Sequence, residues 1–204
     1  TCGAVVPWAC RPAPENRENM GHPADLSECS CSKERAVALG VAVGADGINA
    51  VVADGRGRVI SCLERGLPEG CHSNGHRLAE EVAGVIASLR TSAADGCAGE
   101  VAEAVKTSAL AVGVCVSGCV RRSETLGLQD APLASLVSQS LAGTAAESAE
   151  VALYQDARCG AWAESRWGAA GENCLFLSVA EHISCAVLLN GAPVLGGGWA
   201  GQIG

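Results

Sequence analysis

The stretch that decides the fold begins VALYQDARCGAWAESRWG at residues 151–168, continues LFLSVAEHISCAVLLNG at 175–191 and closes with GGGWAGQIG at 196–204. It predicts a strand, a helix and two further strands, followed by a tight turn at Asn190-Gly191, because Asn-Gly is a strong hairpin signal. Asp156 stands where the first strand meets the helix. An acid at the carboxyl end of a strand is well placed for chemistry on a substrate hydroxyl.

The composition allows a packed core and argues against two classes of partner. Of the 204 residues, 49% are hydrophobic and 18% charged, which is typical of a globular protein. The net charge of −8 argues against binding to nucleic acid. No signal peptide is evident, and no apolar run reaches the roughly 20 residues of a membrane helix. We therefore expect a soluble protein of the cytoplasm or another intracellular compartment, without membrane association.

Twelve cysteines are many for such a chain. Those in apolar runs, such as Cys115, Cys174 and Cys185, are best explained as free thiols that behave as small hydrophobic residues. Cys29-Ser30-Cys31 and the group Cys71, His72 and His76 are two candidate metal sites. Each lacks a complete ligand set with zinc spacing, so ordinary thiols and a polar loop are favoured. The sequence predicts no metal site.

The chain reads as an α/β protein after an irregular extension. Residues 1–35 carry four prolines and no sustained period, which indicates an extended arm. Turn signals and periodicity then predict strands at 36–44, 48–54, 58–63, 109–116, 149–154, 174–179 and 183–189, and helices at 76–89, 100–105, 133–141 and 157–167. Because helices alternate with strands after an opening meander, we expect a mixed sheet flanked by helices.

Five segments in this order resemble the ROK family of sugar kinases and sugar-responsive repressors. The segments are ALGVAVGADGINAVVADGRGRVI, LAVGVCVSGCV, APLASLVSQSLAG, ALYQDARCGAWAESRWGAA and SVAEHISCAVLLNGAPVLGGGWAGQIG. The fourth, for example, resembles the family pattern N-D-A-N-A-A-A-L-A-E. The resemblance implies a ribonuclease H-like, actin-like ATPase fold with a first lobe over 36–120 and a partial, incomplete second lobe over 121–204. An incomplete lobe would leave an apolar face, so we expect a homo-oligomer or a partner chain.

The resemblance also implies a sugar site. Asp156 matches the catalytic acid of the family, although an aspartate here also suits the start of the following helix, and both roles stay open. The residues implied in sugar binding are Gln155, Ser117, Gly118, Trp199 and Gln202. We give Trp199 priority over Trp162 and Trp167, whose spacing of five predicts that they do not share one helix face.

The phosphate side departs from the family pattern. Its first turn, D-x-G-G-T-K, is matched by a degenerate phosphate loop with Gly44, Asp46 and Gly47, in which Asp46 stands near the expected phosphates. Its second turn is Ala180-Glu181-His182-Ile183-Ser184-Cys185-Ala186, without glycine. Backbone N–H groups wrap phosphate best where glycine permits close approach. We therefore expect no ATP or Mg²⁺ cofactor, and a non-catalytic domain for sugar sensing or protein interaction. The alternative is an ATP-dependent sugar kinase with Asp156 as its base.

Overall fold

The computed structural model describes residues 37–54, 57–96, 99–107, 111–118, 122–123, 125–179 and 183–203. The predicted extension over 1–35, with Cys29 and Cys31, lies outside these residues. So do Ala180, Glu181 and His182 of the second predicted phosphate turn.

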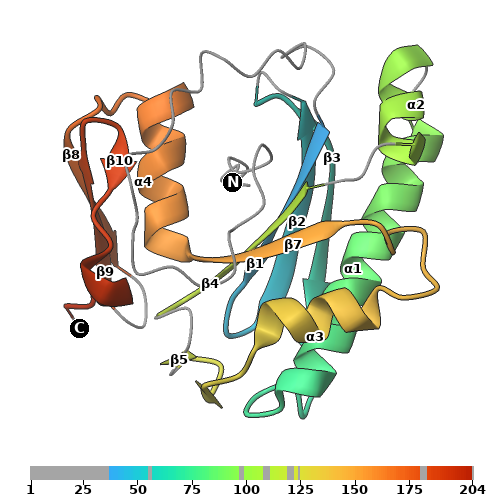
Figure 1. Cartoon of the computed structure of the whole chain (residues 1–204), viewed down its shortest axis with the longest axis horizontal. Helices are drawn as coiled ribbons and strands as arrows, with labels where there is room; N and C mark the ends of the chain where they lie inside the picture. Colours follow the sequence, from blue (N-terminus) through green and yellow to red (C-terminus); the bar gives the residue numbers. More distant parts are fainter. Residues whose placement is uncertain are drawn as a thin grey trace.

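The first sheet is mixed, as the sequence predicts. Strands β1 (Val37–Val43), β2 (Gly47–Asp54) and β3 (Val59–Gly66) form an antiparallel meander. Strands β4 (Ala111–Val116) and β7 (Glu150–Gln155) add to β1 in parallel, which gives the order β3-β2-β1-β4-β7 (Figure 1). Since β7 completes this sheet, the first sheet continues beyond residue 120, where we placed the lobe boundary.

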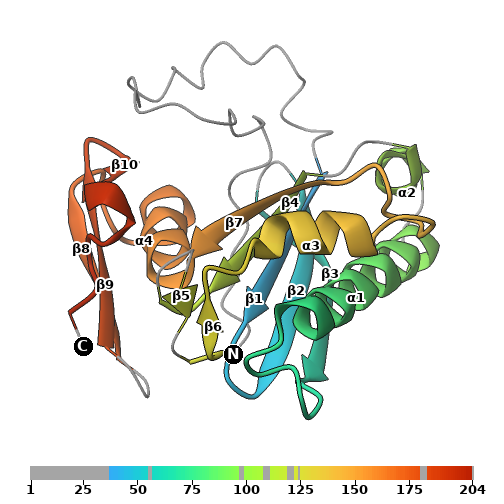
Figure 2. The ribbon, with the colours of Figure 1, turned by 60° about the horizontal axis from the view of Figure 1, so that its bottom comes forward.

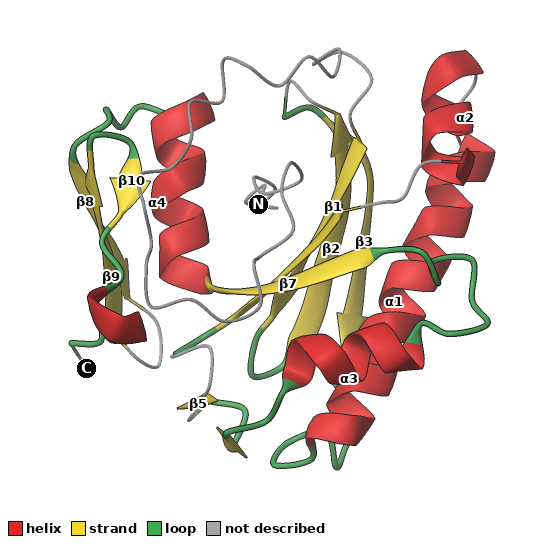
Figure 3. Cartoon of the chain, viewed as in Figure 1, coloured by secondary structure: helices red, strands yellow, loops and turns green. Residues whose placement is uncertain are grey.

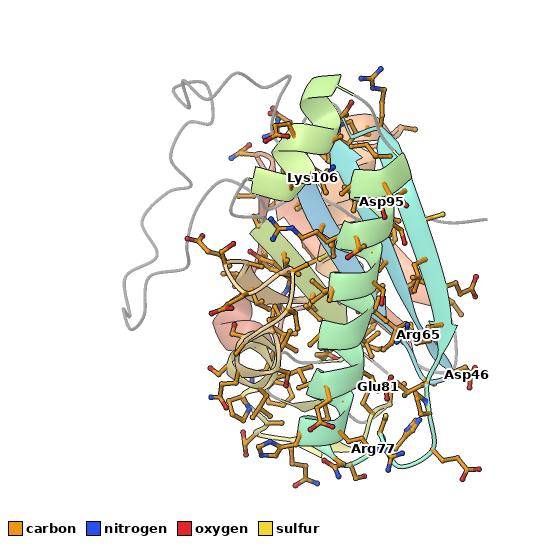
Figure 4. The ribbon with its side chains drawn as sticks, turned by 90° about the vertical axis from the view of Figure 1, so that its right-hand side faces the viewer. Asp46, Arg65, Arg77, Glu81, Asp95 and Lys106 are labelled. Carbon is orange, nitrogen blue, oxygen red and sulfur yellow. The ribbon has the colours of Figure 1, made fainter. Side chains whose placement is uncertain are left out.

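Three helices accompany this sheet, and two of them cover one face of it (Figure 2). They are α1 (Gly75–Gly96), α2 (Gly99–Thr107) and α3 (Leu133–Ser140). The apolar stripe of α1 packs on alternate residues of β1 and β2, which builds a core of small aliphatic side chains. On the outside, Arg65 of β3 and Glu81 of α1 approach to 3.9 Å (Figure 4).

A second unit follows β7 (Figure 3). Helix α4 (Asp156–Trp167) lies against a three-stranded sheet of order β10-β9-β8, formed by β8 (Cys174–Val179), β9 (Ile183–Leu189) and β10 (Ala192–Pro193). A Cβ at Gly160 would lie 2.7 Å from the Phe176 ring, so glycine permits this close approach of helix to strand. The short 3-10 helix η2 (Gly196–Gly198) comes near the end of the described chain.

Two features differ from the sequence prediction. A two-strand hairpin of β5 (Arg122–Ser123) and β6 (Leu128–Gln129) stands where we expected only a loop. Helix α1 runs to Gly96, seven residues beyond the predicted apolar stripe, because Ala93 and Ala94 continue its buried face. Among the described residues, no helix combines the length and the apolar character that crossing a membrane requires.

Candidate functional site

Three parallel strands end side by side, and this edge gathers most of the predicted site residues. Val43 pairs with Val116, and Val116 pairs with Gln155. The next residues along the three strands are Gly44, Ser117 and Asp156, so they stand in line at one sheet edge. Ligands of α/β sheets bind outside the carboxyl ends of parallel strands. The candidate site is therefore this edge, with Gly118 in the loop after β4.

Asp156 is the first residue of α4, and Gln155 before it takes the N-cap position. The Asp156 carboxylate accepts a hydrogen bond from the Ala157 N–H at 2.7 Å and another from the Ser117 hydroxyl. It thus satisfies one N–H of the first helical turn, and an acid here also suits the helix dipole. Burial raises the pKa of Asp156, and hydrogen bonds from the Ala157 N–H, the Ser117 hydroxyl and its own N–H oppose that rise. The helix-stabilising role is present, and it leaves the predicted chemical role open.

The Cys159 thiol lies near Asp156, and Cys115 and Tyr154 lie near Cys159; sequence reasoning did not place these three residues at the site. The Cys115 and Cys159 side chains are in hydrogen-bond contact, and this contact with burial raises the pKa of Cys159 strongly. Burial, with the nearby Cys159, raises the pKa of Tyr154 to about 12. At neutral pH the Cys159 thiol and the Tyr154 phenol are therefore uncharged.

Arg158 anchors the glycine-rich loop to α4. It stands where the family pattern N-D-A-N has its second Asn. Its guanidinium Nη2 donates to the carbonyl oxygens of Leu195, Gly198 and Ala200 at 3.0–3.1 Å. Because Arg158 lies two residues after Asp156, these contacts hold the loop near the first turn of α4. In the sequence, an arginine two residues after the motif acid was the signal that could have indicated this contact.

Two predicted sugar contacts, Trp199 and Gln202, belong to the chain segment that Arg158 contacts. Trp199 follows η2 and is 58% exposed. Gln202 forms an isolated bridge with Ser184 of β9, and its buried Nε2 has no hydrogen-bond partner. The sugar-binding roles of both residues stay predictions.

Trp162 and Trp167 correct one expectation. Their rings do meet, edge to face, with centroids 5.6 Å apart, although we predicted separate faces for Trp162 and Trp167. Residues five apart point in different directions from a helix, but two large indole rings can still reach each other. Trp167 is also the last residue of α4. A Cβ at Gly57 would collide with the Trp167 ring, which therefore packs on the β2–β3 turn at the end of α4 far from Asp156. These rings do not belong to the candidate site.

Gln155 is buried, with both amide atoms lacking a hydrogen-bond partner. Alternation along β7 places it on the same face as Val151 and Leu153, which pack on the core under α1 and α3. A buried amide without partners is costly, by about 1–3 kcal/mol. Such a group often serves a ligand, and sugar binding by Gln155 stays a prediction.

In the first predicted phosphate turn, several backbone groups already have hydrogen-bond partners. The Gly44 N–H donates to the Gly47 carbonyl, and the Asp46 carbonyl accepts the Leu67 N–H, both at 2.9 Å. The His72 Nε2 lies 3.0 Å from the Ala45 carbonyl oxygen. A Cβ at Gly47 would lie 2.9 Å from the Arg65 carbonyl oxygen, so strand pairing alone requires this glycine.

Of the second turn, only the part inside β9 is described. Ser184, Cys185 and Ala186 are buried, and the Cys185 N–H donates to the Gly201 carbonyl. Elsewhere, the six described cysteines have free thiols, and Cys71 is fully buried. Across the described ranges, no three His, Cys, Asp or Glu side chains gather as a metal site would require.

A sequence profile of the ROK family matches residues 38–204. The ROK hexokinase of Thermus thermophilus superposes with a TM-score of 0.62 at 26% identity, over 81% of this chain and 51% of that one. A ROK glucokinase of Streptomyces griseus, in complex with glucose and AMPPNP, has a TM-score of 0.62 at 21% identity, over 82% and 49%. A ROK transcriptional regulator, a homologue of the E. coli MLC protein, has a TM-score of 0.62 at 13% identity, over 83% and 40%.

The chain thus spans about half the length of the first two of these structures. No curated protein sequence matches it significantly. The mixed sheet, the flanking helices and the structural neighbours agree with the actin-like ATPase fold that the sequence predicts. The profile match over residues 38–204 decides the family, and the chain belongs to the ROK family.

Proposed function

We propose that the chain binds a sugar at the sheet edge around Asp156 and transfers no phosphate to it. The observation that carries this proposal is the Asp156 carboxylate, which meets the Ser117 hydroxyl at the ends of two parallel strands. A carboxylate in such a position accepts hydrogen bonds from sugar hydroxyls. The anchored loop with Trp199 adds an aromatic surface, which favours the apolar face of a sugar ring.

The first predicted phosphate turn supports the second part of the proposal, that the chain transfers no phosphate. The Gly44 N–H is engaged within its own turn, and the carboxylate of Asp46 would repel an approaching phosphate. No cation of the first turn offsets this charge, because the family lysine position is Gly47. A sugar sensor needs neither a phosphate cradle nor Mg²⁺. The neighbours include a transcriptional regulator as well as kinases, so sensing is within the range of the family.

The alternative is ATP-dependent phosphorylation of a sugar, with Asp156 as general base. The raised pKa of Asp156 favours it, since a base works best when its pKa approaches the working pH. The overall likeness to a ROK hexokinase at 26% identity also favours it. Asp156 would take the proton of the attacking hydroxyl in that reaction.

Binding and turnover measured together test the proposal. We expect hexoses from a panel to bind by calorimetry, and Asp156→Asn to weaken that binding at least about tenfold, the equivalent of one lost hydrogen bond to a charge. Asp95→Asn, an exposed acid at the end of α1, is the matched control and should bind as the parent does. Mg-ATP should give no binding heat, and a coupled assay should detect no sugar-dependent ADP release.

Two results would overturn this reading. ADP release that requires a hexose and disappears in Asp156→Asn would establish the kinase alternative. Absence of binding for every hexose in the panel, with the fold intact by circular dichroism, would remove the sugar site.

A further inference from the structure

A pair of thiols lies next to the candidate site, on two different elements. Cys115 stands one residue before the end of β4, and Cys159 lies in the first turn of α4. Both thiols are free and buried, and their side chains are in hydrogen-bond contact. A single buried cysteine behaves as a small hydrophobic residue. Two thiols in contact can in addition react with each other.

Strand alternation explains why these two thiols meet. The core under α1 and α3 takes the alternate residues Val112, Val114 and Val116 of β4, so Cys115 points to the opposite face of the sheet. Helix α4 begins directly after β7, the parallel neighbour of β4, and its first turn brings Cys159 to Cys115. The contact therefore joins the first sheet to the second unit (Figure 3).

The proton of the pair belongs to Cys159. The contact with Cys115, burial and the nearby Asp156 charge all raise the pKa of Cys159, so its thiol stays protonated at neutral pH. A retained S–H is a hydrogen-bond donor, and a donor stabilises a thiolate that accepts from it. Cys115 is therefore the sulfur that reacts first, and Cys159 holds the second sulfur and the proton.

The thiols lie close to the entrance of the candidate site. Ser117, two residues after Cys115, and Asp156, three residues before Cys159, are both partly exposed. Three residues of helix span less than one turn, so a molecule at the Asp156 carboxylate is within about 5 Å, along the helix axis, of the level of Cys159. Hydrogen peroxide is hardly larger than water, and it is the oxidant best suited to such a buried pair.

We propose that Cys115 and Cys159 form a reversible disulfide, which hydrogen peroxide closes and a thiol reductant opens. The Cys115 thiolate attacks one peroxide oxygen, the O–O bond breaks, and the released hydroxide leaves as water with the proton that Cys115 gave up. The Cys159 sulfur then attacks the resulting sulfenic acid, the S–O bond breaks, and the hydroxide leaves as water with the Cys159 proton. Two thiols are oxidised by two electrons, and one peroxide is reduced to two waters.

The bond fixes the first turn of α4 to β4. It lies beside the contact between the Asp156 carboxylate and the Ser117 hydroxyl, which come from the same two segments. It also closes a loop over residues 115–159, and such a closure stabilises the folded chain by restricting the unfolded one. The disulfide needs only the two thiols, so it is independent of the proposed sugar binding, which hexose calorimetry tests separately.

Peptide mapping of the full chain tests the proposal. The chain is treated with hydrogen peroxide, the remaining thiols are blocked with N-ethylmaleimide, and tryptic peptides are analysed by mass spectrometry. We expect a disulfide between peptides 107–121 and 159–166 in most chains, and its loss with dithiothreitol. Because peptide 107–121 also contains Cys119, fragment ions must place the bond on Cys115. The thermal midpoint should rise by roughly 5–10 °C on oxidation and return on reduction.

Single alanine variants separate this pair from the other thiols. Cys115→Ala and Cys159→Ala should each abolish the bond and the rise in thermal midpoint. Cys174→Ala is the matched control, because Cys174 is a more exposed thiol that packs against the cluster on α4, and it should behave as the parent does. The mapping of the parent chain stands by itself should a variant fail to fold by circular dichroism.

Three results would overturn the proposal. The first is a parent chain in which the exposed Cys62 is oxidised while Cys115 and Cys159 stay unlinked. The second is a bond from Cys115 to Cys119 or to any cysteine other than Cys159. The third is a yield that falls on dilution, which would place the bond between two chains. An unchanged thermal midpoint in the linked chain would contradict the constraint on α4.

Discussion

Arg158→Met is expected to release the glycine-rich loop from α4 while the rest of the chain stays folded. Methionine fills a similar volume and removes every donor. The Nη2 of Arg158 donates to three loop carbonyls, but an amino group has two hydrogens, so at least one bond is shared. Two hydrogen bonds from a charged donor contribute about 3–6 kcal/mol. Because the freed carbonyls of a partly exposed loop recover water, we expect the lower value, about 3 kcal/mol.

A local measurement is needed because global stability mixes two effects. Replacing a buried guanidinium also removes its desolvation cost, which can offset the lost bonds. Hydrogen exchange of the peptide over 194–204, followed by mass spectrometry, reports the loop alone. A loss of about 3 kcal/mol accelerates exchange roughly 100-fold, since each 1.4 kcal/mol is a factor of ten. The amides to follow are those of Gly198, Ala200 and Gln202, which bond within the loop.

Arg166→Met is the matched control. Arg166 lies on the same helix, and its guanidinium stands 5.1 Å from the Trp162 ring centre, away from the loop. Exchange over 194–204 should stay at the parent rate in this variant. The reasoning is refuted if Arg158→Met accelerates loop exchange less than about threefold, or if both variants accelerate it equally.

Three further changes have defined outcomes. Asp156→Asn should unfold at or above the midpoint temperature of the parent at pH 7. The pKa of Asp156 in the folded chain is raised above 3.8, its ordinary value. The stability that Asp156 contributes is therefore present below pH 3.8 and is lost as the pH rises through the folded-state pKa. The gap between variant and parent in thermal melts should therefore close toward acid pH. Gly201→Ala should cost at least about 2 kcal/mol in urea unfolding, because its φ is +91° and a Cβ would overlap the Cys185 carbonyl, whereas Gly171→Ala has open space and should stay within about 0.5 kcal/mol. Asn74→Ala should lose about 1 kcal/mol, since its side chain accepts an N–H from the first turn of α1, and Asn74→Ser should retain most of it.

The sequence predicts the elements well where periodicity and turn residues agree. The strands at 174–179 and 183–189 and the Asn190-Gly191 turn stand as predicted, because each apolar run is short and a strong turn signal follows the second. The β5–β6 hairpin escaped detection, since two-residue strands have no period. The meeting of Trp162 and Trp167 also escaped, because helix spacing places Cα atoms and not the edges of large rings.

The site is a different case, since its residues come together through strand register. Gly44, Ser117 and Asp156 lie more than 35 residues apart in sequence and meet because β1, β4 and β7 end at one edge. The motif pattern selected all three, but only pairing shows them in line. The contact between Cys115 and Cys159 follows no motif and depends on how α4 leaves β7. Sequence reasoning finds residues that a family pattern names and misses those that packing adds.

The predicted sugar contacts belong to two structural units, and Arg158 joins them. Asp156 and Ser117 depend on the first sheet, whereas Trp199 depends on the loop that Arg158 holds. A sugar that touches both units binds only molecules in which the loop is anchored. Releasing the loop reduces the fraction of such molecules, and the apparent affinity falls in proportion to that fraction. We therefore expect Arg158→Met to weaken hexose binding and Arg166→Met to leave it unchanged, by calorimetry. Equal affinity in the parent and Arg158→Met, with the loop shown to be released by exchange, would place the whole sugar site on the first sheet and exclude Trp199 from it.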